Sequence, residues 1–415
     1  MTRIVVLGGG FAGLGVARAL TRSRHRSSLD VTVVNRDNFL LFTPMLPEVS
    51  SGSVEPRHIA QPIRSALRGS ARFVLGSATA VDLDARSVKT THSVTGEVTD
   101  IAYDHLVIAL GSDSSTHGIP GAQDHSIPLK TLDDAVCVRS KIIAAFEAAA
   151  VARDDVERRR LLTFVVVGGG FAGVECAGEL LAYLRAICKQ YPAADKPARV
   201  ILVAGTGRLL EQLPQRFGDR AAQMLVGRGT EVVFDDDVAS VDAGGLTLES
   251  GKRFDAATIV WCAGVRVPPL VEQLALKHSK QHAIVVNGDM SVPGRSGVWA
   301  LGDCAQIPKP GGGSYPQTAQ HAVREAPLLA RNIMAAIRGR STRPFRYREA
   351  GMMASLGDRE GLADIAGRAM VSGLPAWLMW RAYYLARLPG AYRKTRVAMD
   401  WALSLPFPRD ITSID

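Results

Sequence analysis

The residues with the clearest chemical meaning are the glycines of a hexapeptide that occurs twice. GGGFAG spans residues 8–13 and returns unchanged at residues 168–173. In such a G-x-G-x-x-G array the first glycine allows a tight turn, the second lets a pyrophosphate approach, and the third lets the following helix pack closely. That helix directs free N–H groups at the phosphates. Similar turns also occur in folds that bind no nucleotide, but two copies predict two nucleotide sites. The array glycines are Gly8, Gly10, Gly13, Gly168, Gly170 and Gly173.

The positions that meet the ribose hydroxyls are unusual in both copies. An acidic residue normally follows the second strand of a dinucleotide fold and accepts from these hydroxyls. Here the first copy has Asn35 and Arg36, and the second has Ala204 with Arg208 close behind it. Asn35 can accept from a hydroxyl without the charge, or it is only a turn residue. Ala204 leaves room beside Arg208, which loosens the preference for NADH over NADPH.

Two acidic residues are candidates for contacts nearer the reacting groups. Asp303 follows an apolar run in residues 297–305, where it can accept from a polyol hydroxyl such as the ribitol of a flavin, or cap the next helix. That helix is expected over residues 315–333. Glu175 lies in the helix after the second glycine array. It either takes part in the chemistry or complements the positive end of the helix dipole.

The elements that must position these residues alternate between strands and helices, which predicts an α/β fold with two Rossmann-like dinucleotide-binding domains. Segment 39–49 contains Pro44 and Pro47 and is too broken for a helix or a central strand. Each half closes with an apolar strand and a glycine, so we also expect cofactor contacts at Ala109, Gly111 and Gly264. The main strands are expected at residues 4–7, 29–34, 103–111, 199–203, 231–234 and 257–261.

Composition narrows the class of protein. The 415 residues are 47% apolar, which is enough for two or three domains with sizeable cores. The formal net charge of +9 admits nucleic acid, an anionic membrane or anionic substrates, but no basic stretch has a nucleic-acid motif. Five dispersed cysteines fit a reducing compartment, and no cysteine or histidine spacing suits a metal site. The first strand begins after Met1-Thr2-Arg3, which leaves no room for a signal peptide.

The C-terminal segment combines basic and aromatic residues. From Arg368 to Arg409 seven basic residues stand against a single acid, Asp400. On a helix, one face would hold Trp377, Trp380, Tyr384 and Leu388. This pattern predicts amphipathic helices that dock Trp377–Arg409 on an anionic lipid surface without spanning it. Packing onto the body of the protein or a dimer contact is the alternative.

Together these motifs resemble the type II NADH dehydrogenases, the non-pumping NADH:quinone oxidoreductases of the FAD/NAD(P)-dependent pyridine nucleotide oxidoreductases. The resemblance covers essentially the whole chain. It includes both GGGFAG units, the Gly-Asp pair at 302–303, TAQHA at 318–322 and MASLGDREGLADIAG at 353–367. It implies a glutathione-reductase-like arrangement of the two domains.

The resemblance assigns roles to individual residues. The first unit would bind FAD, with Asp303 on the ribitol, and the second would bind NADH or NADPH. Glu175 would lie beside the nicotinamide and flavin rings, and Gln320, after Ala319, where the quinone is expected. The family often has a further glutamine where this chain has Arg324-Glu325. The FAD residues would include Phe11, Ala12, Asn35, Arg36 and Thr43, and the NAD(P)H residues would include Phe171 and Ala172.

The implied reaction passes a hydride from the nicotinamide to FAD and then two electrons to a membrane quinone. The implied location is peripheral, on the cytoplasmic face of the cell membrane, with no nucleic-acid partner and no metal. The expected domains are 1–118 with 267–345 for FAD, 119–266 for NAD(P)H, and 346–415 for membrane docking.

Three alternatives share the fold. A sulfide:quinone oxidoreductase would need paired reactive cysteines, and Cys176 has no evident partner in the sequence. A ferredoxin or rubredoxin reductase would use small redox proteins instead of lipid-dissolved quinone. A non-catalytic redox sensor would hold FAD and NAD(P)H without turnover. The sequence does not decide between NADH and NADPH, and it does not identify the quinone. It leaves open whether the protein is a homodimer and whether it has a role beyond quinone reduction. It also leaves open whether Glu175 is catalytic or positional.

Overall fold

The computed structural model describes residues 1–23, 26–191, 197–347, 351–365, 367 and 369–412. The chain divides into two compact units. Unit 1 comprises Met1–Leu41, Ala60–Asp113 and Val265–Arg348. Unit 2 comprises Phe42–Ile59, Ser114–Gly264 and Glu349–Asp415.

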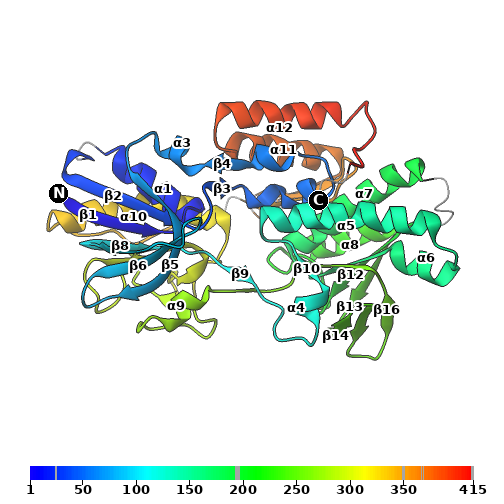
Figure 1. Ribbon diagram of the computed structural model, residues 1–415, viewed down its shortest axis with the longest axis horizontal. Helices are drawn as coiled ribbons and strands as arrows, with labels where there is room; N and C mark the ends of the chain where they lie inside the picture. The colour runs from blue at the N-terminus through cyan, green and yellow to red at the C-terminus, as the bar shows by residue number, and fades with distance from the viewer. Residues whose placement is uncertain (24–25, 192–196, 348–350, 366, 368, 413–415) are drawn as a thin grey trace. The chain divides into compact units, whose positions relative to one another are not determined.

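Unit 1 is built on a seven-stranded sheet of order β20-β8-β1-β2-β5-β6-β7 (Figure 1). The first five strands in this order are parallel, and β6 and β7 extend the sheet as an antiparallel excursion. The central strands are continuous apolar runs because helices or loops cover both faces of a parallel sheet. The strands are β1 (Thr2–Leu7), β2 (Leu29–Asn35), β5 (Arg72–Asp82), β6 (Ser87–His92), β7 (Val98–Ala102), β8 (His105–Ile108) and β20 (Val298–Ala300).

Two helices of unit 1 pack side by side against this sheet, α1 (Phe11–Thr21) and α10 (Ala319–Ile337). Their close approach depends on Gly15, where an added Cβ would lie 2.7 Å from the Cβ of Ala326. The N-termini of both helices therefore belong to one packed layer. The shorter elements here are β3 (Phe39–Leu41), β4 (Ala60–Pro62), α3 (Ile63–Leu67), α9 (Pro269–Gln273), β19 (Ile284–Val285) and β21 (Ala305–Gln306).

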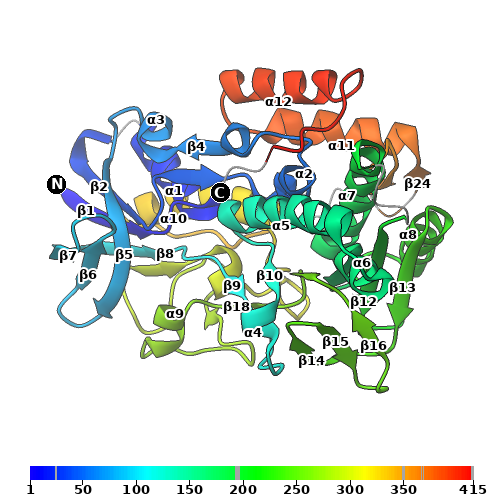
Figure 2. The same cartoon turned by 45° about the vertical axis from the view of Figure 1, so that its right-hand side comes forward.

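Unit 2 contains the second Rossmann-like sheet, which is wholly parallel with the order β10-β17-β11-β12-β13. Helices α5, α7 and α8 flank it (Figure 2). The bounds are β10 (Ile127–Pro128), α5 (Leu132–Val151), α6 (Asp155–Leu161), β11 (Thr163–Val167), α7 (Phe171–Ile187), β12 (Arg199–Ala204), α8 (Gln215–Gly227), β13 (Thr230–Phe234) and β17 (Thr258–Trp261). A small antiparallel sheet follows β13, with β14 (Val238–Asp242), β15 (Gly245–Leu248) and β16 (Arg253–Asp255).

The C-terminal part of unit 2 is an antiparallel sheet followed by two helices. Strand β22 packs on α7, and α11 packs on the sheet. Helix α11 ends at Arg387, Gly390 after Pro389 caps the start of α12, and α12 runs back along α11 (Figures 1 and 2). The elements are β22 (Met353–Ser355), β23 (Gly361–Ile365), β24 (Ala369–Ser372), α11 (Leu374–Arg387) and α12 (Ala391–Leu403). Among the described residues, no helix combines the length and the apolar character needed to cross a membrane.

The α/β class and the two Rossmann-like sheets are confirmed, but two local predictions were wrong. The helix expected from Tyr315 begins at Ala319, because Tyr315 instead pairs its backbone with Ile307 ahead of Pro316. Segment 39–49 is not irregular throughout. It forms β3, a 3₁₀ turn at Thr43–Met45 and the short helix α2 (Leu46–Ser50). Pro44 and Pro47 stand in the first turns of these helical segments, where a missing N–H costs no hydrogen bond.

Candidate functional site

The first glycine turn joins β1 to α1 and depends on contacts that only glycine permits. Gly8 has φ +104°, and a Cβ there would lie 2.1 Å from the carbonyl oxygen of Ala109. A Cβ on Gly13 would lie 2.0 Å from the carbonyl oxygen of Gly8. Gly10 instead has open space within 4 Å of where its Cβ would be. The outer glycines set the turn, and the middle one leaves room for a pyrophosphate.

Asn35 stabilises this turn from the end of β2. Its Oδ1 accepts from the N–H of Gly9 at 2.8 Å, and its Nδ2 donates to the carbonyl of Asp37 at 2.8 Å. Arg36 is exposed and lies 3.5 Å from Asp37 and 3.6 Å from Asp113. Asn35 therefore stabilises the turn through its hydrogen bonds, as one of its two expected roles required. Arg36 is the more exposed to solvent of the two residues.

Asp303 is presented by a 3₁₀ turn at Gly302–Cys304. Its Oδ2 accepts from the Ser112 hydroxyl at 2.8 Å. The N–H of Gly302 donates to Oε2 of Glu325 at 2.9 Å, so a buried carboxyl on α10 holds the turn in place. Burial raises the pKa of Glu325 to about 7. The sequence did not predict that Glu325 stabilises this turn. The signal that could have found it is that the resembled family often has a glutamine where this chain has Arg324-Glu325.

Gln320 lies in the first turn of α10 and is restrained by its neighbours. Its Nε2 donates to the hydroxyl of Tyr347 at 2.9 Å. The guanidinium of Arg324 lies 4.4 Å from the centre of the Tyr347 ring and donates to the Gln320 carbonyl at 2.7 Å. The side chain of Gln320 is thus held in one orientation at the start of the helix.

The remaining predicted residues of the first site fall in both units. Phe11 and Ala12 open α1, whereas Thr43 lies in unit 2. Ala109 follows β8 and donates its N–H to Leu7 at 2.8 Å. Gly111 has φ +70° with open space around it. Unit 1 therefore brings together the glycine turn, Asn35, the end of β8 and Asp303 around one edge of its sheet.

The second glycine turn, in unit 2, repeats the geometry of the first. Gly168 has φ +121°, and a Cβ on Gly173 would lie 1.8 Å from the Gly168 carbonyl oxygen. Gly170 has open space, as Gly10 has. Phe171 and Ala172 open α7. Gly264 has φ +75° and packs against the ring of His117.

The loop after β12 shows a feature that sequence reasoning missed. Ala204 is fully buried behind the glycine turn. The next residue, Gly205, has Oδ1 of Asp237 only 1.7 Å from where its Cβ would be, and Oδ1 of Asp235 lies 2.9 Å from the corresponding position on Gly207. Because β13 pairs with β12, residues after β13 lie beside this loop. Acids that follow the neighbouring strand therefore lie beside the loop after β12, where β12 itself offers none.

Glu175 is buried in the helix that follows this turn. Its Oε1 accepts from the backbone N–H of Ser355 at 3.0 Å and from the indole N–H of Trp380 at 2.9 Å. Burial raises the pKa of Glu175 to about 8, although both hydrogen bonds act in the opposite direction. A carboxyl that is neutral near pH 7 adds little to a helix dipole, so this environment favours a proton-holding role.

The structure of the C-terminal helices contradicts the expectation that the tryptophan face of α11 meets lipid. Trp377, Trp380 and Leu388 are at most 7% exposed, because α11 turns these large side chains onto the β22–β24 sheet. The guanidinium of Arg381 lies 3.8 Å from the centre of the Trp377 ring and 4.5 Å from that of Trp401. The other faces of α11, α12 and the tail expose a different apolar set. Its members are Leu374, Leu378, Met379, Tyr392, Met399, Leu403, Leu405 and Phe407.

Comparison with known proteins gives two family matches. Residues 2–326 match the pyridine nucleotide-disulphide oxidoreductase family, and residues 350–410 match the NDH2 C-terminal domain. The chain is 32% identical to the type II NADH:quinone oxidoreductase Ndh of Mycobacterium tuberculosis, over 97% of this chain and 88% of that protein. It is 30% identical to a probable NADH dehydrogenase of Dictyostelium discoideum, over 99% of this chain and 91% of that protein.

Solved structures share the fold at lower identity. NDH2 from Plasmodium falciparum in complex with NADH has a TM-score of 0.90 at 19% identity, covering 99% of both chains. The sulfide:quinone oxidoreductase of Aquifex aeolicus has a TM-score of 0.74 at 18% identity, covering 96% of this chain and 95% of that chain.

Proposed function

The chain belongs to the type II NADH dehydrogenase family, and from this we propose that it oxidises NADH and reduces a membrane quinone through FAD. The observation that supports this most directly is the pair of glycine turns, each with an open middle glycine, in one chain that ends in an NDH2 C-terminal domain. Two nucleotide cradles match a reaction that needs a nicotinamide donor and a flavin. The match of residues 350–410 to the NDH2 C-terminal domain supports a quinone as the acceptor.

The residues of unit 1 fit FAD, and we propose this unit as the flavin-binding domain. Gly10 leaves the space that a pyrophosphate requires, and a Cβ there would intrude on it. Asp303, held by Ser112 and by the turn that Glu325 stabilises, can accept from a ribitol hydroxyl. Bound FAD would supply the redox chemistry, accepting a hydride and passing on two electrons.

Unit 2 fits NADH, with Gly170 at the pyrophosphate. Asp237 and Asp235 lie beside the loop where the adenosine ribose is expected. Their carboxylates can accept from ribose hydroxyls and would repel a 2′-phosphate. The guanidinium of Arg208 donates to the carbonyl of Glu211 at 2.6 Å, and no ion pair joins it to Asp235 or Asp237 among the described residues. We therefore infer a preference for NADH over NADPH.

Glu175 and Gln320 are the residues proposed for the chemistry. Glu175 holds a proton in a buried setting and can exchange it with a group that gains or loses charge. Gln320, fixed by Tyr347, offers its remaining amide hydrogen to a quinone carbonyl.

The structure contains a pair of neighbouring cysteines, which a sulfide:quinone oxidoreductase would need, but their environment does not favour a reactive thiolate. The structure places Cys262 next to Cys176, where sequence reasoning saw no partner, and both thiols are free. The hydrogen bond to Cys262 and burial raise the pKa of Cys176 well above its ordinary value. Sulfide chemistry needs a thiolate, so this pair does not favour that reaction.

We propose that the protein lies peripherally on an anionic membrane, on the cytoplasmic face. The exposed apolar side chains of α11, α12 and the tail would enter the headgroup region, and nearby basic residues would meet anionic lipid. The five free cysteines agree with a reducing compartment. A quinone dissolved in lipid makes such docking useful.

Stopped-flow absorbance of the flavin-loaded protein tests the function. NADH should bleach the oxidised flavin under anaerobic conditions, and a menaquinone or ubiquinone analogue should then restore it. Bleaching without recovery by quinone would exclude the quinone reaction. If neither NADH nor NADPH bleaches the flavin, the second glycine turn does not form a working nucleotide site.

A further inference from the structure

Unit 1 has a groove of about 600 Å³ along α10 (Figure 1), a volume within the range of small-molecule sites. One wall is a single face of α10, whose residues recur at helical spacing between Arg324 and Ala335. The other wall is the segment 341–347, which follows α10. We call this hollow the arginine groove, because four of its lining residues are arginines: Arg324, Arg331, Arg343 and Arg346.

The second wall is held against α10 by a buried amide. Asn332 on α10 is 2% exposed, and its Nδ2 donates to the backbone carbonyls of Arg343 at 2.9 Å and Asp289 at 3.0 Å. Its Oδ1 accepts from the N–H of Arg343 at 2.9 Å. The buried Phe345 donates its N–H to the carbonyl of Gly288 at 2.7 Å. The groove is therefore built from a helix and a segment whose backbone is fixed to it.

The charge that lines the groove has one sign. Residues 319–347 include six arginines and one acid, Glu325, which bonds the N–H of Gly302 instead. No acidic residue lines the groove, and none of its four arginines pairs with a carboxylate among the described residues. Asp289 accepts from Ser291 and Thr342 and does not line it. Guanidinium groups gathered without a counter-charge repel one another and attract an anion.

Backbone contacts orient two of these arginines without using up their donors. Arg331 donates through Nε to the Pro327 carbonyl at 3.2 Å, which leaves both terminal nitrogens unused by the described residues. Arg324 lies over the Tyr347 ring and donates one Nη hydrogen to the Gln320 carbonyl. A guanidinium has five N–H donors in a planar fork that matches two oxygens of a phosphate. The remaining donors suit that geometry.

A second hollow, of about 330 Å³, adjoins the groove at Arg331 and is also basic. Arg338 and Arg340 line it together with Ser23. The Ser23 hydroxyl is buried and has no hydrogen-bond partner among the described residues. An anion with more than one phosphate group can therefore meet further donors beyond Arg331.

We propose that the arginine groove binds a phosphate-bearing anion. Fixed walls, convergent guanidinium groups and the absence of a lining acid are what such a ligand requires. A free diphosphate and the headgroup of an anionic phospholipid offer the same chemistry, and the experiment separates them. The site lies beyond the proposed reaction and does not depend on it.

The test titrates flavin-loaded full-length protein with inorganic pyrophosphate in a calorimeter, with NAD⁺ present to occupy the second glycine turn. The wild type should bind saturably. Arg331→Gln combined with Arg343→Gln should raise the Kd at least about tenfold, because hydrogen bonds between charged partners are lost.

The matched control is Arg22→Gln combined with Lys89→Gln. Both side chains are exposed in unit 1 and lie outside the groove lining, and the pair removes the same charge. The control should keep the Kd within about twofold of the wild type, because salt screens charges at exposed, distant positions.

Co-sedimentation with phosphatidylglycerol vesicles forms the second arm. Pyrophosphate binding that only the groove variant loses, with vesicle binding equal in both variants, identifies a free anion. If pyrophosphate does not bind but the groove variant sediments less than the control, the ligand is a lipid headgroup. If the groove variant and the control behave alike in both arms, the proposal is wrong. Should the double variant lose its flavin or its Tm, Arg346→Gln, at an exposed position, decides by the same comparison.

Discussion

Two carboxyl side chains, those of Asp237 and Glu175, are proposed for different roles because their surroundings differ. Asp237 is exposed beside the loop after β12. Glu175 is enclosed by α7, β22 and α11 and keeps a proton to about pH 8. The first is suited to accepting hydrogen bonds, and the second to exchanging a proton. We therefore expect nucleotide choice and pH dependence to depend on different residues.

Replacing Asp237 by Asn should weaken discrimination between the two nucleotides. The change removes the charge that repels a 2′-phosphate, so the ratio of kcat/KM for NADH to that for NADPH should fall about tenfold. Steady-state quinone reduction with each nucleotide measures it. Asp236→Asn is the control, since Asp236 bonds the backbone and hydroxyl of Ser250 instead. An unchanged ratio in Asp237→Asn would place the ribose elsewhere.

The raised pKa of Glu175 predicts how stability depends on pH. The unfolded carboxyl loses its proton near pH 4.5, but the folded one keeps it to about pH 8. Between these values the native state binds more protons, so the free energy of unfolding should fall as pH rises, by up to about 1.4 kcal/mol per pH unit from this group. In Glu175→Gln that part of the slope should disappear. Urea unfolding at pH 6 and pH 8 compares the two proteins, and equal slopes would contradict the shift.

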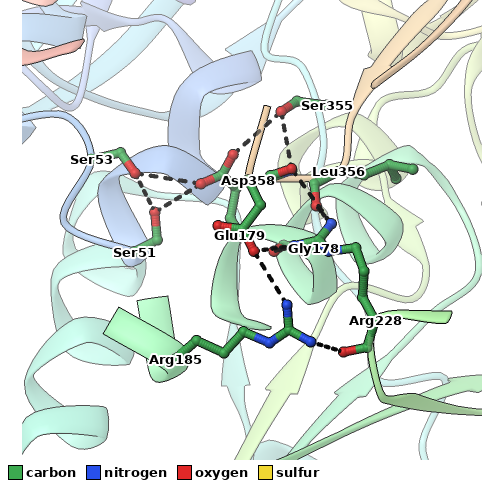
Figure 3. Close-up of polar contacts among 10 residues, drawn as sticks. Ser51, Ser53, Gly178, Glu179, Arg185, Arg228, Ser355, Leu356 and Asp358 are labelled. Carbon is green, nitrogen blue, oxygen red and sulfur yellow. Dashed lines mark hydrogen bonds and ion pairs between the residues drawn. The ribbon is translucent and has the colours of Figure 1, made fainter. Parts of the chain in front are cut away.

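At the scale of elements, unit 2 depends on the close contact of α7 with the turn that follows β22. Gly178 lies where an added Cβ would be 2.3 Å from the carbonyl oxygen of Leu356. Arg228 from the loop after α8 donates to the same carbonyl and to Asp358 at 2.8 Å (Figure 3). These contacts hold Ser355 against both carboxyls of α7. These two hydrogen bonds of Ser355 require the helix and the strand to approach this closely.

Gly178→Ala should therefore destabilise the protein. The methyl group meets backbone, which cannot rotate away, so a loss of about 1–3 kcal/mol in unfolding free energy is expected. Gly227→Ala in α8 is the control, because its Cβ would enter open space and alanine favours a helix. Thermal unfolding of both variants measures the difference. A Tm for Gly178→Ala equal to that of the wild type would show that the contact relaxes easily.

At the scale of the whole molecule, the proposed function requires a soluble donor and a lipid-dissolved acceptor to reach one protein. The exposed apolar residues of α11, α12 and the tail, rather than the buried tryptophans, are the candidate membrane contact. The same helices carry Arg387, Arg393, Lys394 and Arg396, in a chain of net charge +9. Binding should then need both anionic lipid and apolar insertion.

Leu403→Glu combined with Phe407→Glu should weaken vesicle binding at least about tenfold, because two inserted side chains become charged. Co-sedimentation with phosphatidylglycerol vesicles measures the binding. Even the wild-type protein should bind less to neutral vesicles. Val94→Glu, a similarly exposed site in unit 1, is the control. If the double variant binds the vesicles as tightly as the wild type, α12 and the tail do not form the membrane contact.

The sequence by itself determined the features that depend on neighbours along the chain. Two glycine arrays after apolar strands specified the Rossmann-like units, because backbone conformation and the packing of one strand on one helix are local. The same applies to the approximate strands of both sheets. Where local signals competed, as at Tyr315 and at Pro44 with Pro47, the predicted boundaries were wrong, since prolines both begin and end helical turns.

Only the tertiary structure decided which distant residues meet. The pairing of β12 with β13 placed Asp237 beside the glycine-rich start of the loop after β12, where residues 204–208 include no acid. Packing of α11 buried Trp377 and Trp380, which an isolated helix would have turned to lipid. The contacts of Glu179 join residues from 51 to 355, and burial raises the pKa of Glu175. Periodicity reports that a face is apolar, but the partner of that face is a property of the folded chain.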